Sequence, residues 1–222
     1  MRTDVEIKED VLDELAWQPD IDETQIGVIV ENGVVTLSGV VDSYSKKLAA
    51  EIAVKRVKGV RAIAEDVEVK YGISYKKTDK EVAKAVIKAL EWNSAVPDED
   101  IKVKVEDGWV ILSGEVAWDY QKKAAKKTVG NLLGVKKVVN NITLKKSIKP
   151  FEVKDRIRKA FARMANVDAE GIEVVTSGHT VTLKGRVSSL QEREDAEAAA
   201  YMAPDVYDVV NELKIQYRAE YA

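Results

Sequence analysis

The sequence predicts an α+β protein made of three tandem copies of one αββαβ unit, each a three-stranded sheet with two helices packed on one face. Residues 33–39 read GVVTLSG, and the pattern returns as GWVILSG at 108–114 and more loosely as TVTLKG at 180–185. The closing glycines of these stretches are 75 and then 71 residues apart, and the same offsets place almost every apolar position of one copy on the next. We therefore predict three domains, called repeats 1, 2 and 3, at residues 1–73, 76–146 and 150–218.

Each copy is expected to open with a helix. Thr3-x-x-Glu6 and Thr78-x-x-Glu81 match the capping box, in which a hydroxyl and a carboxylate satisfy backbone N–H groups of the first turn. Repeat 3 has Pro150 near the corresponding turn instead of a Thr cap. Apolar residues then recur at the i, i+4, i+8 spacing of a buried helix face: Ile7, Val11, Leu15; Val82, Val86, Leu90; Val153, Ile157, Phe161.

A β-hairpin is predicted next in each copy, because apolar and polar residues alternate on both sides of a turn signal. Asn32-Gly33 and Asp107-Gly108 are strong hairpin turn sequences. In repeat 3, Ser177-Gly178 places the glycine one residue earlier, so a different turn is expected there.

Glycines interrupt the second hairpin strand at one fixed place, which indicates a bulge or a close backbone approach. We expect the first helix to cross at this point and leave no room for a Cβ atom. A second helix follows and is predicted to end at a glycine in repeats 1 and 2, before a last strand that pairs beside the hairpin. The glycines with these structural roles are Gly33, Gly39, Gly59, Gly108, Gly114, Gly134 and Gly185.

The last strand completes a pattern that resembles the BON (bacterial OsmY and nodulation) domain. The resemblance rests on three features: D-G-x-V-x-L-x-G in the hairpin, Gly-Val after the second helix, and V-x-x-V-x-N-x-[IL] in the last strand. The last motif is found at 135–142 and 206–213. Repeat 1 departs from the last motif by carrying Glu65 in place of the Asn. The resemblance implies a non-enzymatic module of the kind often suggested to bind phospholipid or to sit at membrane surfaces, and it provides no catalytic residues to carry over.

The residues themselves favour no reaction centre. The chain has no cysteine and one histidine, His179, which lies in a hairpin turn and is expected to be solvated. Neither a Ser-His-Asp triad in each copy, nor a calcium loop, nor a glycine-rich nucleotide or RNA motif is present, so we expect no enzyme activity, no metal, no cofactor and no nucleic-acid partner.

The best candidate surface is a lysine-rich second helix in repeat 2, the most basic third of the chain. Its lysines fall opposite the predicted buried face, beside aromatic residues that could lie on anionic headgroups. A solvated outer face, or one paired with the acidic repeat 1, is the alternative. The candidate residues for contact with lipid or a protein partner are Trp118, Tyr120, Lys122, Lys123, Lys126, Lys127 and, from the equivalent helix of repeat 1, Tyr44.

Two functions are therefore expected to compete. One is association with phospholipid surfaces or envelope components, under osmotic stress. The other is a structural module that binds a protein or self-associates as a homo-oligomer through sheet edges and complementary charges. The sequence shows no secretory signal and no apolar run long enough to span a membrane, so we expect a cytoplasmic protein, or a periplasmic one if a leader has been removed.

Overall fold

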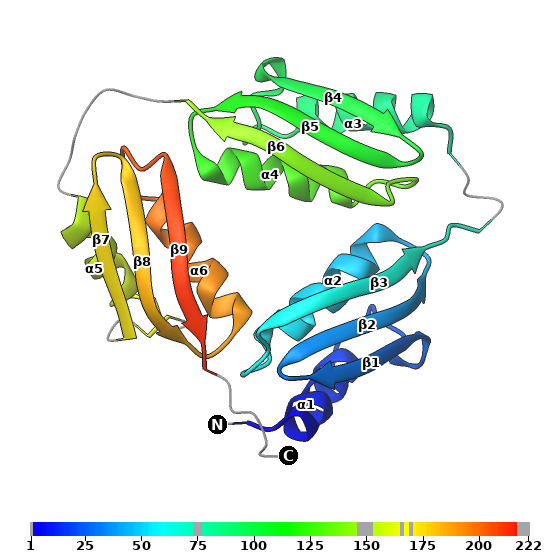
Figure 1. The fold of residues 1–222 in the computed structure, drawn as a ribbon. Coiled ribbons are helices and arrows are strands. Elements are labelled where there is room, and N and C mark those ends of the chain that lie inside the picture. The colour runs from blue at the N-terminus through cyan, green and yellow to red at the C-terminus, as the bar shows by residue number, and fades with distance from the viewer. Residues whose placement is uncertain (1, 73–76, 146–152, 165–166, 169–170, 217–222) are drawn as a thin grey trace. The chain divides into compact units, whose positions relative to one another are not determined.

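The computed structural model describes all residues except 1, 73–76, 146–152, 165–166, 169–170 and 217–222. It confirms the predicted α+β fold in three repeated units (Figure 1). Each repeat runs helix, strand, strand, helix, strand, and forms its own three-stranded sheet. The second strand of the repeat lies between the other two.

The element bounds follow the predicted pattern closely. Repeat 1 contains α1 (Asp4–Ala16), β1 (Ile26–Glu31), β2 (Val34–Val41), α2 (Tyr44–Arg56) and β3 (Ala62–Val69). Repeat 2 contains α3 (Asp79–Trp92), β4 (Ile101–Glu106), β5 (Trp109–Val116), α4 (Asp119–Gly130) and β6 (Lys137–Leu144). Repeat 3 contains α5 (Val153–Phe161), β7 (Ile172–Ser177), β8 (Thr180–Val187), α6 (Leu190–Tyr201) and β9 (Asp208–Ile215).

The sheets combine an antiparallel hairpin with a parallel third strand. In repeat 2, β4 pairs antiparallel with β5, and β5 pairs parallel with β6 in a register that puts Trp109 beside Lys137. Repeat 3 has the same arrangement in β7, β8 and β9. A parallel pair needs a crossover connection, which the second helix of each repeat supplies.

Each core lies between the two helices and one face of the sheet. The predicted helix stripes are buried in all three repeats, as are the inward residues of the central strands β2, β5 and β8. The second helices bury small side chains, among them Ala50, Ala125 and Ala196, so helix and sheet approach closely. Alternate strand residues point to the other face, which remains open to solvent.

The strand glycines do mark a close approach, but the expected neighbour was wrong. A Cβ atom on Gly114 would lie 2.0 Å from the carbonyl oxygen of Asp100, the residue just before β4, and not against the first helix. Gly39 and Gly185 meet the carbonyls of Gln25 and Gly171 at the same 2.0 Å. Antiparallel pairing brings this carbonyl across, because Gly114 is paired with Ile101.

Candidate functional site

The lysine surface of repeat 2 is built on α4. Ala125, Val129 and Gly130 are buried, so the opposite side of the helix faces solvent. Lys123, Lys126 and Lys127 are exposed on that side, whereas Lys122 is half-buried. We call the three exposed lysines, together with Trp118 and Tyr120, the α4 surface.

Aromatic side chains flank the lysines at the start of this helix. Trp118 is 43% exposed and Tyr120 is 54% exposed. The Trp118 backbone N–H donates to Oε1 of Gln121 at 3.0 Å, which satisfies one amide at the helix start and holds the indole beside the first turn. The structure therefore places apolar rings and cationic groups on one accessible helix.

The charge of the α4 surface is partly compensated. Lys123 Nζ lies 2.8 Å from a carboxylate oxygen of Asp119, one turn earlier in the helix. Within the described part of the chain, no ion pair forms with Lys126 or Lys127. These two lysines thus contribute most of the positive charge that a partner would meet.

A hydrogen bond from the sheet fixes the position of α4. Nδ2 of Asn140 in β6 donates to the carbonyl oxygen of Lys122 at 2.8 Å, and Oδ1 of Asn140 accepts from the Ile142 amide at 3.3 Å. Asn211 makes the matching bond to the Arg193 carbonyl in repeat 3, at 3.1 Å. The Asn of the last-strand motif is therefore a structural link between strand and helix, a role that the sequence pattern did not reveal.

Tyr44 does not belong to an exposed surface, so that part of the prediction was wrong. Its side chain is only 8% exposed, and it joins the buried cluster that contains Ala125 and Val129. Tyr44 and these residues belong to one compact unit of the backbone. The ring is buried because it packs at Gly130, where the absence of a side chain leaves space.

Two exposed tryptophans were not among the predicted site residues. Trp17 and Trp92 occupy equivalent positions at the ends of the first helices of repeats 1 and 2, Trp17 as the C-cap of α1 and Trp92 as the last residue of α3, and each is 82% exposed. Repeat 3 has Arg163 at this position, also exposed. A position that alternates between Trp and Arg is not a core position, and this was the available signal that the two rings are exposed.

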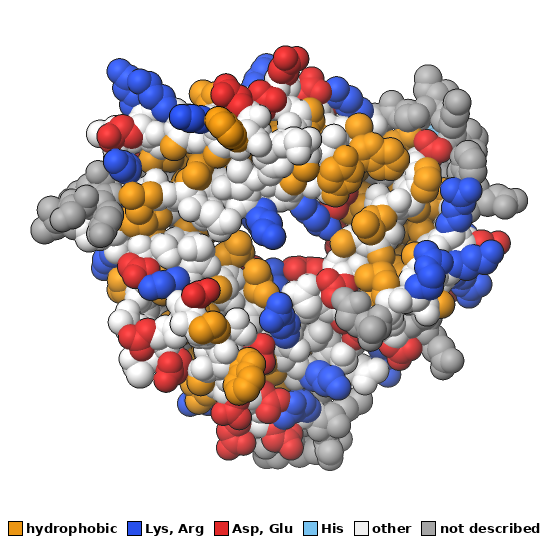
Figure 2. All heavy atoms as spheres, turned by 180° about the vertical axis from the view of Figure 1, so that it is seen from behind, with side chains coloured by type: hydrophobic (Ala, Val, Ile, Leu, Met, Phe, Trp, Pro, Cys, Tyr) orange, Lys and Arg blue, Asp and Glu red, His pale blue; other side chains and the backbone are white. Residues whose placement is uncertain are grey.

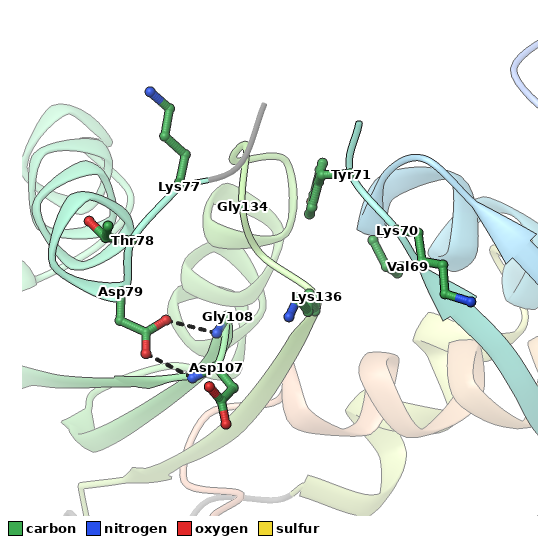
Figure 3. Close-up of a pocket in the computed structure, with 10 residues that line it drawn as sticks. All are labelled: Val69, Lys70, Tyr71, Lys77, Thr78, Asp79, Asp107, Gly108, Gly134 and Lys136. Atoms are coloured by element: carbon green, nitrogen blue, oxygen red, sulfur yellow. Dashed lines mark hydrogen bonds between the residues drawn. The ribbon is translucent and has the colours of Figure 1, made fainter. Parts of the chain in front are cut away.

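A hollow of about 590 Å³ lies beside the start of α3 and the β4–β5 turn (Figure 3). The carboxylate of Asp79 accepts hydrogen bonds from the amides of Asp107 at 2.8 Å and Gly108 at 2.9 Å (Figure 3). Tyr71 donates its hydroxyl to the Val135 carbonyl at 2.7 Å, and burial raises the pKa of this phenol, so it stays protonated as a donor. Both polar groups thus have structural partners.

His179 is not a simply solvated turn residue, in contrast to our expectation. Its Nδ1 lies 2.9 Å from the carbonyl oxygen of Asp205, and its ring centroid lies 4.7 Å from that of Tyr207.

Among the described residues no group of three or more His, Cys, Asp or Glu side chains is placed to hold a metal ion. None of the described helices is both long and apolar enough to cross a bilayer.

Basic and hydrophobic side chains occur together on α3 as well, where Lys80, Lys84, Lys88 and Trp92 are exposed. Figure 2 shows lysine and arginine side chains beside hydrophobic ones over the side opposite to that of Figure 1. The α4 surface differs from α3 in having two exposed aromatic rings, Trp118 at the N-cap and Tyr120 in the first turn.

The repeated αββαβ unit, with a fixed strand glycine and an Asn that links the last strand to the second helix, defines a class of small tandem modules. Residues 3–71, 78–146 and 151–217 match the BON domain. The chain belongs to the BON domain family, as the resemblance indicated.

Two curated relatives share part of the sequence. The chain is 33% identical over 129 residues to osmotically-inducible protein Y of Escherichia coli (strain K12), an alignment that covers 56% of this chain and 64% of that protein. It is 30% identical over 123 residues to a 21 kDa hemolysin of Actinobacillus pleuropneumoniae, covering 54% and 63%. The alignments therefore span less than two thirds of either relative.

Solved structures resemble the chain only distantly. The C-terminal domain of CdsD, a structural protein of the type III secretion system of Chlamydia trachomatis, is 14% identical and aligns over 96% of this chain and 98% of its own, with a TM-score of 0.26. A second structure of CdsD is 13% identical, with the same TM-score. Scores this low do not establish a common arrangement.

Proposed function

We propose that this protein is a non-enzymatic binding protein that associates with anionic phospholipid surfaces through the α4 surface of repeat 2. The observation that carries the proposal is the placement of three exposed lysines and two exposed aromatic rings on one helix. Lysines attract anionic headgroups, and Trp and Tyr favour the boundary between headgroups and acyl chains. The relationship to osmotically-inducible protein Y supports a role under osmotic stress.

The expected strength follows from the number of lysines. Each basic residue near an anionic membrane contributes about 1 kcal/mol, so Lys126 and Lys127, whose charges Asp119 does not compensate, contribute about 2 kcal/mol, or roughly 30-fold in binding. This attraction is electrostatic and falls as the salt concentration rises.

Cosedimentation of the full chain with vesicles tests the proposal. Vesicles of phosphatidylglycerol mixed with phosphatidylcholine should bind the protein, and vesicles of phosphatidylcholine alone should not. Replacing Lys122, Lys123, Lys126 and Lys127 by Glu should abolish binding. A control that reverses the same number of charges in the same repeat, at Lys84, Lys88, Lys102 and Lys104, should lose much less, and equal losses in the two variants would rule out a specific surface.

A further inference from the structure

The edge strand β1 differs from the equivalent strands of the other repeats. β1 reads IGVIVE, whereas β4 reads IKVKVE and β7 reads IEVVTS. An edge strand presents unpaired N–H and C=O groups, and charged side chains normally prevent other strands from adding to it. Lys102 and Lys104 serve that purpose in β4, but Ile29 of β1, at the position of Lys104, is apolar and 58% exposed.

The other edge strands of the described sheets carry or are bounded by charges. β3 contains Glu65, Asp66 and Glu68, and β9 contains Asp208, Glu212 and Lys214. β6 has no charge between Lys137 and Lys145, but antiparallel pairing with itself over that span would place these two lysines opposite each other. Like charges directly opposite one another are destabilising.

The open face beside β1 carries further exposed apolar residues together with acidic ones such as Asp66 and Glu68 of β3. Val34 and Val40 of β2 are 36% and 40% exposed, and Ala62 and Ala64 of β3 are exposed too. β1, β2 and β3 contain no Lys or Arg. A strand added at β1 would therefore meet the apolar Ile29 and no Lys or Arg of the three strands.

We infer that β1 is a docking strand for β1 of a second copy of this chain, paired antiparallel so that two sheets join into one of six strands. The sequence of β1 is self-complementary: with Val28 opposite Val28, Ile29 faces Gly27 of the other copy, and Glu31 faces the uncharged Gln25. No like charges meet in this pairing, which is the isologous contact of a two-fold dimer. The inference is independent of the α4 surface, so either can fail without the other.

Analytical ultracentrifugation of the full chain over a range of concentrations tests the inference. The mass is expected to rise with concentration from the 24.6 kDa of one chain to twice that value. Ile29→Lys, which introduces the residue found at this position in β4, should weaken dimerisation at least tenfold. Val175→Lys, at the same position in β7 and 38% exposed, should leave it unchanged.

Hydrogen exchange of the unaltered protein provides a test that does not depend on a variant folding. The amides of β1 should exchange more slowly at high protein concentration, while those of β4 and β7 should not change. A chain that stays monomeric at every concentration would overturn the inference. So would a dimer that forms equally well with Ile29→Lys.

Discussion

In repeat 2 the hairpin turn is held by a helix, whereas in repeat 3 it is held by a side chain of the turn itself. The Asp79 carboxylate at the start of α3 binds the amides of Asp107 and Gly108, and Asp4 binds those of Asn32 and Gly33 in the same way. In repeat 3 the equivalent of Asp79 is Pro150, which lies outside the described residues. There the turn residue His179 reaches the carbonyl of Asp205 instead.

The two turns differ in which of their residues adopt the left-handed backbone conformation, with positive φ. Asp107 and Gly108 both have positive φ, 50° and 78°, as a type I′ turn requires, but in repeat 3 only Gly178 does, at 59°, as in a type II′ turn. The turn prediction for repeat 3 is thereby confirmed. A Cβ on Gly108 would lie 2.8 Å from the carbonyl of Gly134, the glycine that follows α4.

Repeat 3 replaces both of these glycines. His179 stands where Gly108 would be, and Asp205, with φ of 65°, stands where Gly134 would be. The side-chain bond adds to a backbone bond that is kept here: the Tyr207 N–H donates to the His179 carbonyl at 3.1 Å, as the Lys136 N–H does to the Gly108 carbonyl at 2.9 Å. The comparison teaches that the module keeps this backbone bond while the residues around it change.

The largest effect is expected where the three repeats do not differ. Gly114→Ala or Gly185→Ala should destabilise its own repeat by at least about 3 kcal/mol, because the new Cβ overlaps a backbone carbonyl and the φ values, 139° and 130°, disfavour a side chain. Gly178→Ala has nothing within 4 Å of its Cβ and should cost only about 1 kcal/mol. Amide hydrogen exchange, resolved by repeat, measures both, and equal costs would show that the close approach is not limiting.

Loss of the Asp79 carboxylate is expected to destabilise repeat 2 and to leave the stability of repeat 3 unchanged. Asp79→Ala leaves two backbone amides without their acceptor and should destabilise repeat 2 by about 1–2 kcal/mol. The amides of Asp107 and Gly108 should lose protection against exchange, while those of β7 and β8 stay protected. Unchanged protection at the repeat 2 turn would contradict the assigned role of Asp79.

Loss of the hydrogen bond between the last strand and the second helix is expected to destabilise repeats 2 and 3. Asn140→Ala removes the bond to the Lys122 carbonyl and should cost about 1 kcal/mol, and Asn211→Ala should do the same in repeat 3. Urea unfolding measures both losses, and exchange of the second-helix amides should show each loss in its own repeat only. An unchanged free energy of unfolding in either variant would contradict the assigned link.

The smallest effect is expected from pH at the capping boxes. Hydrogen bonding to the Thr78 backbone lowers the pKa of Glu81 from its usual 4.5, and bonding to Thr3 lowers that of Glu6. A lowered folded-state pKa stabilises above the ordinary value, and this contribution is lost as pH falls through the folded value. Glu81→Gln should therefore flatten the acid dependence of α3 exchange between about pH 5 and 3, and an unchanged slope would contradict the assignment.

Local patterns predicted the fold because they depend on residues close in sequence. The apolar spacing of Ile7, Val11 and Leu15 shows which side of α1 is buried without knowledge of any partner. The neighbour of Gly114 could not be predicted in this way, because Asp100 reaches it only through the register of β4 on β5. The partner of Asn140 was missed for the same reason.

The candidate site was predictable only in part. Helical spacing placed the α4 lysines on the solvent side, and three of the four are exposed. The burial of Tyr44 depends on packing at Gly130, far away in sequence, and no local pattern indicates it. The exposure of Trp17 and Trp92 was detectable only by comparing the three repeats.

The most direct test of the membrane proposal measures which tryptophan reaches lipid. Four full-length variants, each keeping one of Trp17, Trp92, Trp109 and Trp118 and carrying Phe at the other three, are mixed with phosphatidylglycerol vesicles whose acyl chains are brominated to quench fluorescence. The account predicts that Trp118 is quenched in these vesicles and not in brominated phosphatidylcholine vesicles. Quenching of Trp17 or Trp92 with none of Trp118 would contradict it.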